Sequence, residues 1–505
     1  MVTSFAEAKR PPYLIIAILM VGAFITFLNN TLLNIALPSI MQEMNVGPTA
    51  VQWVTTGYML VNGIMIPTTA FLIEKYSVRR LFLVAIGVFS IGTIIAAFTP
   101  YFFLLIIARM VQASGGSIMM PLLMNVILVS FPIEKRGMVM GILGFILMFA
   151  PAIGPTLSGF IIEQFHWRAL FYLIAPITIF VFILGFIFLK DKKYRPELRL
   201  DKVSLMLSSI GFGSLLFGFS VAGELGWFSP YVFVPILVGG VTLLVFTLRQ
   251  LKLDRPMLNF GVFQYSMYNL SIFIIMVVQI AMFSGVLLIP IYVQTVLGVP
   301  PMQAGLLLLP GAVVNACMSP ITGRLFDRFG GRILAVTGLT VITISTFYFS
   351  QLTVDSNPIA VMILHAIRMF GMSMVMMPVQ TNGLNQLPRK LYPHGTAMNN
   401  TLMQVTAALG TGLMITIMTM KEKSVLNSFS KQLGNLTNLP AEQQQKLTLQ
   451  AMVEGINTAF FVSALFAFIA LIFSFFIKRA YPDEYKFSGD SSRLKKKWAS
   501  KSLHS

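Results

Sequence analysis

The chain has 505 residues, of which 56% are hydrophobic and 11% are charged. Because charged residues make up about 25% of a typical soluble domain, this composition excludes a soluble enzyme or binding domain and predicts an all-α integral membrane protein. The formal net charge of +18 could suit a nucleic-acid-binding protein. The placement of the basic residues argues against that interpretation.

Apolar segments follow one another along almost the whole chain. A helix needs about 20 apolar residues to cross the hydrocarbon core of a membrane, and fourteen segments are predicted as spans on this basis. They cover residues 13–36, 51–73, 81–99, 101–122, 138–162, 168–189, 203–223, 229–248, 269–293, 303–322, 333–352, 358–381, 396–420 and 456–477. The longest polar interval, 421–455, is predicted to be an outer loop with a short helix at 440–453, opened by Pro440.

The distribution of Lys and Arg orients these spans. With the N-terminus inside, 29 of the 36 basic residues lie on inner segments, five lie on outer segments and two lie within spans. Since basic residues are retained on the cytoplasmic side during insertion, both termini are predicted to be cytoplasmic. The basic tail 483–505 is expected to contact anionic lipid head groups, and no nucleic-acid partner is expected.

Two arginines, Arg109 and Arg368, interrupt the apolar spans. A charge at the centre of a membrane helix costs roughly 2.5–3.5 kcal/mol even on the lenient insertion scale, so each is expected to face a polar cavity or a partner. Gln112 lies three residues after Arg109 and therefore shares its helix face. His365, three residues before Arg368, gives a second polar face. The alternative is a static hydrogen bond from each arginine to backbone carbonyls.

The arginines belong to an internal repeat. TAFLIEKYSVRRLFLV (69–84) matches TGRLFDRFGGRILAV (322–336) at a shift of 253 residues, and ARMVQASGGSIMMP (108–121) resembles IRMFGMSMVMMP (367–378). Small residues of a later span also match at a shift of 258: Gly137, Ala150 and Gly154 with Gly395, Ala408 and Gly412. We therefore predict two related six-helix bundles, 1–200 and 257–482, with an inserted helix pair at 201–256.

Several motifs, taken in order, resemble those of a known transporter family. They are LNNTLLNIALPSI (28–40), VQWVTTGYMLVNGIMIP (51–67), ARMVQASGG (108–116), GILGFILMFAPAIGPTLSG (141–159) and HWRALF (166–171). The chain resembles the fourteen-helix drug:proton antiporters of the major facilitator superfamily, and most closely the lincomycin-resistance-type multidrug exporters of Gram-positive bacteria. The resemblance excludes only the loop 421–455 and the tail. It implies the major facilitator fold, with two six-helix bundles and two inserted helices.

The resemblance implies a cytoplasmic gate in the two repeated loops. Each loop has an acid near one helix end and a basic residue five positions later, which could clamp neighbouring helix ends: Glu74 with Arg79, and Asp327 with Arg332. Ala70 and Ser77 stand where the family usually has glycine, so the first gate is expected to pack less tightly than the second. The alternative is a solvated loop whose basic residues serve orientation only.

The segment 141–159 fits the family's antiporter signature. Its small residues permit close helix approach, and its prolines remove backbone donors and can bend the helix. The signature positions are Gly141, Ala150, Gly154, Pro155 and Gly159. A bent, closely packed fifth span suits alternating access, and simple helix packing is the alternative.

The resemblance also implies a central substrate cavity and a route for protons. Its cavity positions are Asn29, Asn34, Trp53, Tyr58, Arg109, Gln112 and Arg368. Many relatives carry an aspartate where this chain has Asn29, which cannot carry a proton. We find no acid deep in any span, so the leading candidates are the vestibule carboxylates Glu163 and Glu224. His365, whose side chain has a reference pKa near neutrality, is the third candidate, and ordinary packing is its alternative role.

Nothing in the sequence indicates an enzyme, a cofactor or a metal site. Cys317 is the single cysteine, and neither a phosphate-binding GxxxxGK[ST] loop nor a Ser-His-Asp set is present. We predict a monomeric, proton-coupled multidrug antiporter of the cell membrane, whose partners are amphiphilic drugs such as lincosamide-like antibiotics, protons and lipids. An exporter of a dedicated endogenous lipid or peptide, and a non-transporting scaffold or sensor, remain as alternatives.

The predicted orientation can be tested by labelling. Single cysteines at Ser424 and Ser502, in a Cys317→Ser background, are exposed to an impermeant maleimide on intact cells. Only the cysteine at position 424 should react, because the charge distribution places 421–455 outside and the tail inside. Labelling at 502 but not at 424 would reverse the orientation.

Overall fold

Helices make up the regular structure of the described chain. The structure is a computed structural model, and it describes residues 13–51, 53–190, 200–433 and 440–479. Its α-helices in these ranges are α1 (Tyr13–Glu43), α2 (Pro48–Val51), α3 (Trp53–Met65), α4 (Thr69–Lys75), α5 (Val78–Phe98), α6 (Phe102–Ser130), α7 (Ile133–Gln164), α8 (Ala169–Phe188), α9 (Lys202–Leu225), α10 (Pro230–Lys252), α11 (Ser266–Ile291), α12 (Pro301–Phe329), α13 (Gly331–Phe349), α14 (Pro358–Leu384), α15 (Tyr392–Leu433) and α16 (Ala441–Ser474). The prediction of an all-α protein is confirmed for this part of the chain.

Thirteen of the described helical segments are long and apolar enough to cross a membrane. One of them, Trp53–Lys75, joins α3 and α4 through a short turn. The remaining predicted span, 138–162, lies within α7 and includes three residues whose side chains fall outside the described part. Thirteen spans are therefore confirmed, and the fourteenth stays a prediction.

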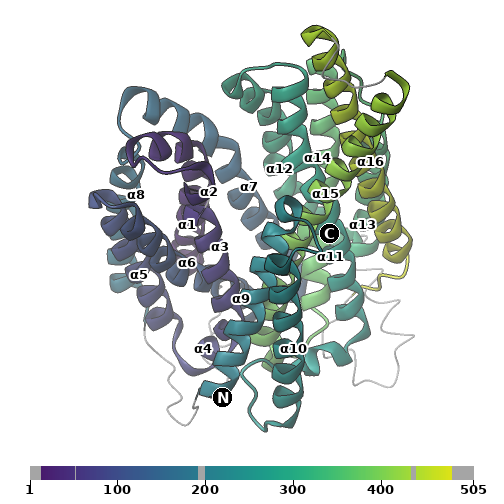
Figure 1. The fold of residues 1–505 in the computed structure, drawn as a ribbon. Helices are drawn as coiled ribbons and strands as arrows, with labels where there is room; N and C mark the ends of the chain where they lie inside the picture. The colour runs from purple at the N-terminus through teal and green to yellow at the C-terminus, as the bar shows by residue number, and fades with distance from the viewer. Residues whose placement is uncertain (1–12, 52, 191–199, 434–439, 480–505) are drawn as a thin grey trace.

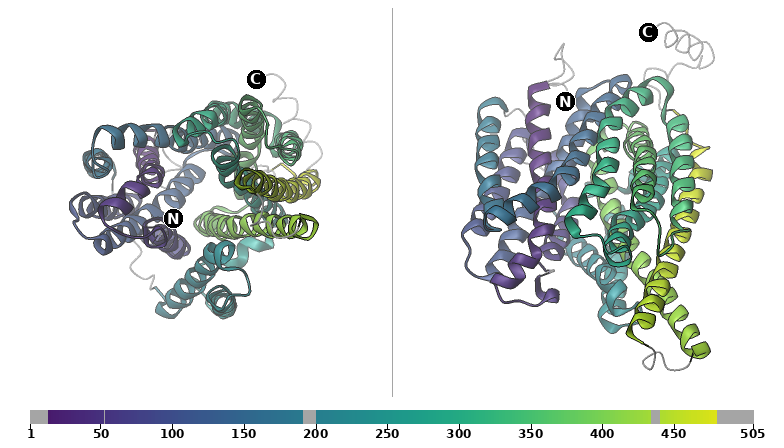
Figure 2. Two further views of the ribbon diagram at one scale, coloured as in Figure 1. Left: turned by 45° about the horizontal axis from the view of Figure 1, so that its top comes forward. Right: turned by 90° about the horizontal axis from the view of Figure 1, so that it is seen from above.

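The helices form two bundles with a helix pair between them. The N-terminal half comprises α1–α8 and the C-terminal half comprises α11–α16, and the two halves contact each other mainly through α7 and α12. In Figure 1 the ribbons of the halves diverge toward the end that holds α2 and meet at the end that holds α4. The pair α9 and α10 lies at one edge of the molecule, where α9 contacts both α3 and α15 (Figure 2, left).

The interval 421–455 is more helical than its polarity predicts. α15 continues to Leu433, and α16 begins at Ala441 with Pro440 as its N-cap, so the interval is built from extensions of two spans and not from a loop with a separate short helix. The reason is local, because no glycine or proline follows Gly412 until Gly434. These extensions project beyond the other helices (Figure 2, right).

Local sequence signals fix the ends of the inserted pair. The Asp201 carboxylate accepts a hydrogen bond from the Val203 N–H at the start of α9 and pairs with Arg249 near the end of α10, with an Nε–Oδ2 distance of 2.6 Å. These contacts, with Arg249 the largest cause, lower the pKa of Asp201 to about 2. α9 ends at Leu225, and the next residue, Gly226, has a φ of 80°, which suits glycine.

Close helix packing places α5 against α6. A Cβ atom at Gly92 would lie 2.7 Å from the carbonyl oxygen of Ala108 and 2.7 Å from the backbone nitrogen of Gln112. The two backbones can approach only because glycine has no side chain. This contact holds the polar residues of α6 against α5.

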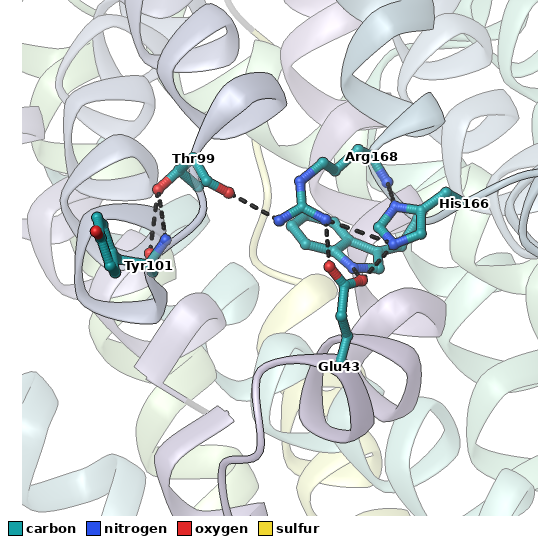
Figure 3. Close-up of polar contacts among 6 residues, drawn as sticks. Glu43, Thr99, Tyr101, His166 and Arg168 are labelled. Atoms are coloured by element: carbon teal, nitrogen blue, oxygen red, sulfur yellow. Dashed lines mark hydrogen bonds and ion pairs between the residues drawn. The ribbon is translucent and has the colours of Figure 1, made fainter.

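A polar cluster ties three connections of the N-terminal half together (Figure 3). Glu43, at the end of α1, accepts hydrogen bonds from Trp167 Nε1 at 2.6 Å and Arg168 Nη1 at 2.5 Å, and its carboxylate also contacts His166 Nε2. Arg168 donates a second bond to the Thr99 carbonyl, in the α5–α6 connection, at 2.8 Å. Burial alone would raise the pKa of the Glu43 carboxyl. The hydrogen bonds from Arg168 and Trp167 and the nearby positive charge together outweigh burial, so the pKa of Glu43 lies below its ordinary value.

Replacing Glu43 by Gln should destabilise this end of the bundle. The change weakens charge-assisted bonds at a partly exposed site, so we expect a loss of about 1 kcal/mol, visible as a lower melting temperature in detergent. Because the folded-state pKa is lowered, the difference from wild type should be full above the ordinary value of 4.5 and should disappear as the pH falls below it. Glu442→Gln, at an exposed acid on α16, is the control, and an equal effect there would contradict the prediction.

Candidate functional site

Arg109 lies at the centre of a buried polar network in the N-terminal half. Its guanidinium group donates to Gln112 Oε1 at 2.7 Å, to Asn30 Oδ1 at 3.0 Å and to the carbonyl of Val54 at 3.4 Å. Its Cζ atom lies 4.3 Å from the centre of the Tyr58 ring. The side chain is fully buried, so in this conformation it lies inside the bundle and not on an exposed wall. Neutral acceptors and one aromatic face thus surround the charge.

The network joins four helices. Gln112 donates to Thr93 Oγ1 of α5 at 2.8 Å and accepts from Asn29 Nδ2 of α1 at 3.3 Å. The predicted residues Asn29, Tyr58, Arg109 and Gln112 therefore lie together, while the side chain of Asn34 falls outside the described part. Sequence reasoning missed Asn30 and Thr93. Thr93 has a detectable signal, since the repeat shift of 253 relates it to Thr346.

Arg368 has an equivalent network in the C-terminal half. It donates from Nε to Thr346 Oγ1 of α13 at 3.1 Å, and from Nη2 to the Ala281 carbonyl of α11 at 2.7 Å. A Cβ atom at Gly285 would collide with this guanidinium group, so glycine provides the space for it. Both arginines thus combine backbone carbonyls, as the static alternative expects, with side-chain acceptors from neighbouring helices.

The three proton candidates occupy different surroundings. Glu163 lies exposed near the end of α7. Glu224 belongs to the last turn of α9, and its side chain falls outside the described part. His365 is buried on α14 against Gly311 of α12, and its Nδ1 atom has no hydrogen-bond partner. Of the two whose side chains are described, neither Glu163 nor His365 takes part in the hydrogen bonds of the Arg109 network.

The two halves are latched at the end that holds the repeated loops. Asp327 of α12 accepts hydrogen bonds from the backbone N–H groups of Gly137 and Met138 of α7, each at 2.8 Å. Beside it, Arg136 donates to Asn385 Oδ1 at 2.7 Å and to Tyr392 Oη at 3.1 Å. The second turn of α7 thus presents two backbone donors to a carboxylate of the other half, and Arg136 of the same helix also bonds to that half.

A second latch is related to the first by the internal repeat. Glu74 of α4 lies 3.4 Å from Nε2 of His394 of α15. Glu74 corresponds to Asp327 at the shift of 253, and His394 corresponds to Arg136 at the shift of 258. The sequence predicts Glu74 and Asp327 as gate residues, but sequence reasoning missed Arg136 and His394, although the shift of 258 relates these two to each other. The predicted basic residues behave differently, since Arg79 donates to the Phe186 carbonyl of α8 at 2.9 Å and Arg332 is exposed.

The latches differ in how closely the helices approach. A Cβ atom at Gly137 would lie 2.5 Å from the Gly323 carbonyl, so α7 and α12 touch through their backbones. Ala70 occupies the position equivalent to Gly323 and belongs to a buried apolar cluster that also contains Ala397 of α15. Ser77, at the other substituted position, caps α5 by accepting from Arg80 N at 3.2 Å, whereas the equivalent Gly330 has a φ of 82°.

α7 also packs closely on α1. A Cβ atom at Gly154 would lie 2.5 Å from Thr31 Oγ1, and Thr31 also donates weakly to the Ala150 carbonyl at 3.4 Å. Gly141 lies against the Ser319 backbone of α12, whereas Gly159 faces open space. The side chain of Pro155 falls outside the described part. α7 is thus held between the two halves by small residues on two of its faces.

Comparison with known families identifies this architecture. The model of the Major Facilitator Superfamily matches residues 19–411. The chain belongs to the major facilitator superfamily. It is therefore a multi-pass membrane transporter.

Several members of this superfamily resemble the chain over most of its length. The MFS-type transporter YhcA of Bacillus subtilis (strain 168) is 43% identical, with 95% of this chain and 95% of the relative covered. The lincomycin resistance protein LmrB of the same organism is 41% identical over 92% of this chain and 95% of its own. LmrB of Listeria innocua is 40% identical over 94% of this chain and 98% of its own.

Solved structures of the superfamily share the fold at low identity. The human organic anion transporter MFSD10 matches with a TM-score of 0.65 at 11% identity, covering 92% of this chain and 100% of its own. The proton:xylose symporter XylE matches with a TM-score of 0.59 at 13% identity, covering 92% and 96%. At these identities the likeness concerns the fold alone.

The two faces of α7 give a matched pair of variants. Gly154→Leu should abolish transport while the protein still reaches the membrane, because its side chain would displace Thr31 and separate α7 from α1. Gly159→Leu should keep near wild-type activity, since no atom lies within 4 Å of its added Cβ. Equal transport by both variants, measured at equal membrane abundance, would assign Gly154 to ordinary packing.

Proposed function

We propose that this transporter exports amphiphilic drugs from the cytoplasm in exchange for protons, as a monomer in the cell membrane with both termini inside. The observation that carries the proposal is the likeness to lincomycin resistance proteins, at 41% identity over 92% of this chain. Lincosamide-like compounds are accordingly the first substrates to test. The intact Arg109 network supports the same conclusion.

The latches support an outward-facing state. Glu74 and Asp327 lie on loops that the distribution of Lys and Arg assigns to the cytoplasm. Their contacts with His394 and with α7 hold the halves together at that end. We propose that these acids form the cytoplasmic gate, and that Arg79 and Arg332 orient its loops.

The polar groups around Arg109 favour neutral or weakly basic substrates. Asn29, Asn30, Gln112 and Thr93 are all uncharged acceptors or donors, so they offer no counter-charge to a permanent cation. Trp53, which is 38% exposed, is a candidate aromatic contact. The chain's 32 methionines and 43 phenylalanines can supply adaptable apolar surface for bulky molecules.

The function is tested by expressing the chain in a host that lacks its major drug pumps. We expect resistance to several amphiphilic drugs, lincosamides among them, and loss of that resistance when a protonophore collapses the proton gradient. A lipid or envelope phenotype without resistance would indicate a dedicated endogenous cargo. No flux of any compound would indicate a scaffold or sensor.

Coupling can be assigned with variants assayed in inverted vesicles under an imposed pH gradient. Arg109→Ala should stop transport, because it removes the charge that organises Asn30, Gln112 and Tyr58. Glu163→Gln or Glu224→Gln should impair proton-driven transport more than His365→Gln, because vestibule carboxylates can take protons from the outer solution. Loss of coupling in His365→Gln alone would assign the proton to the histidine instead.

A further inference from the structure

The inserted pair occupies a place where the two halves would otherwise meet. The internal repeat relates α7 to α15 and α12 to the α3–α4 span, so the close α7–α12 contact has an expected equivalent between α3 and α15. That equivalent forms mainly at the gate end, where Glu74 of α4 meets His394, and direct contact between α3 and α15 is sparse. Further along, α9 lies between α3 and α15 (Figure 2, left).

α9 is joined to α15 through backbone contact and a hydrogen bond. A Cβ atom at Gly412 of α15 would lie 2.7 Å from the Phe219 carbonyl and 3.5 Å from the Ala222 Cβ atom of α9. Trp227, directly after α9, donates from Nε1 to Thr416 Oγ1 at 2.8 Å. If α9 slid along α15, the hydrogen bond would break, and side chains of one helix would clash with the backbone of the other.

The other end of the pair is tied to the same helix. Gln250 of α10 accepts a hydrogen bond from the Leu258 N–H at 3.3 Å, and the next residue, Asn259, donates its N–H to His394 Nδ1 at 3.2 Å. The segment leaving α10 is therefore fixed both to α10 and to α15. The pair is attached to α15 at both of its ends.

The contact between α9 and α3 is apolar, and Leu216 of α9 packs over Gly63 of α3, where an added Cβ atom would collide with Leu216 Cδ1. Trp53 stacks on Phe217 with ring centres 6.1 Å apart and planes 22° apart. A Cβ atom at Gly213 would meet only Ile64 and Leu60 side chains, at 3.1 Å or more. An open groove of about 360 Å³, lined in part by Leu60, Gly213 and Phe217, lies beside this contact. Apolar contact is non-directional, so this contact can be re-formed in another register without breaking the hydrogen bond that joins Trp227 to α15.

We propose that α9 and α10 move as part of the C-terminal half, and that the α3–α9 contact is the surface that slides when the transporter changes conformation. The inference rests on the alternating access contained in the proposed function. α9 then lines the substrate path on this side in both the outward-facing and the inward-facing conformation. With α9 between them, α3 and α15 are separated by about one helix width more than in direct contact. The α7–α12 side has no such spacer.

Disulfide trapping tests the two contacts of α9 separately. In the full chain with Cys317→Ser, one variant carries Ala222→Cys and Gly412→Cys, and another carries Ile64→Cys and Gly213→Cys. An added Cβ at Gly412 lies 3.5 Å from the Ala222 Cβ atom, and an added Cβ at Gly213 lies 3.4 Å from the Ile64 Cγ1 atom. These short distances make both pairs candidates for a disulfide, for which Cβ atoms about 3.5–4.5 Å apart are typical. Gly223→Cys with Ile415→Cys, and Gly63→Cys with Leu216→Cys, repeat each measurement if a first pair folds poorly. The purified proteins are oxidised mildly in lipid nanodiscs, and the crosslinked fraction is measured.

Each pair is compared with and without a change that opens the cytoplasmic latch. Arg136→Ala removes the bonds to Asn385 and Tyr392, and Asp327→Asn weakens the bonds from α7 and serves as a second unlatched background. We expect the α9–α15 yield to stay constant and the α3–α9 yield to fall at least twofold.

The opposite pattern would assign the pair to the N-terminal half. Equal changes at both contacts, or constant yields in both unlatched backgrounds, would also overturn the proposal. Because no transported compound is used, failure of this test is distinguishable from failure of the proposed drug export.

Discussion

Each half of this transporter is organised around a buried guanidinium group. Its N–H groups must find hydrogen-bond acceptors other than a carboxylate or bulk water. Inside a membrane no water is available to hydrogen-bond an unpaired polar group. The helices around Arg109 and Arg368 are therefore positioned by the acceptors that these helices supply. Arg109 draws on α1, α3 and its own helix, and Gln112 extends the network to α5. The glycines between α5 and α6 permit this geometry, because they bring Gln112 within reach of Thr93. The polar network and the close packing therefore depend on each other.

The repeat produces two gates that are alike in position and different in chemistry. At one gate Asp327 is held by backbone N–H groups beside Arg136, and at the other Glu74 meets an imidazole. Glycine lets the backbones touch at the first gate, whereas Ala70 stands at the equivalent position of the second. The α7–α12 side is consequently the closer contact, and the α3–α15 side is filled by α9. An approximately two-fold molecule thus has one direct and one spaced interface.

The spans, the repeat and the family could be predicted from the sequence because apolar length and motif order are local properties. The polar partners could not, because they depend on which helix faces meet. The motif points to Asn29, yet the neighbouring Asn30 makes the contact with Arg109. Arg79 was expected to clamp a gate acid, but it bonds to a carbonyl of α8, while Arg136 and His394 reach the other half. The interval 421–455 was expected to be a loop because it is polar, although its lack of glycine and proline favours continued helix.

Because α15 is long, a small tilt of this helix moves its far end over a large distance. This helix runs without a proline after its first turn from the gate residue His394 to Leu433, which corresponds to roughly 60 Å at 1.5 Å per residue. A tilt of about 10° pivoted at the gate would displace its far tip by roughly 10 Å, since displacement grows with helix length. Because such a tilt pivots at the gate, a small movement there accompanies a large displacement of the outer tip, and α16 follows that displacement through its contact with α15.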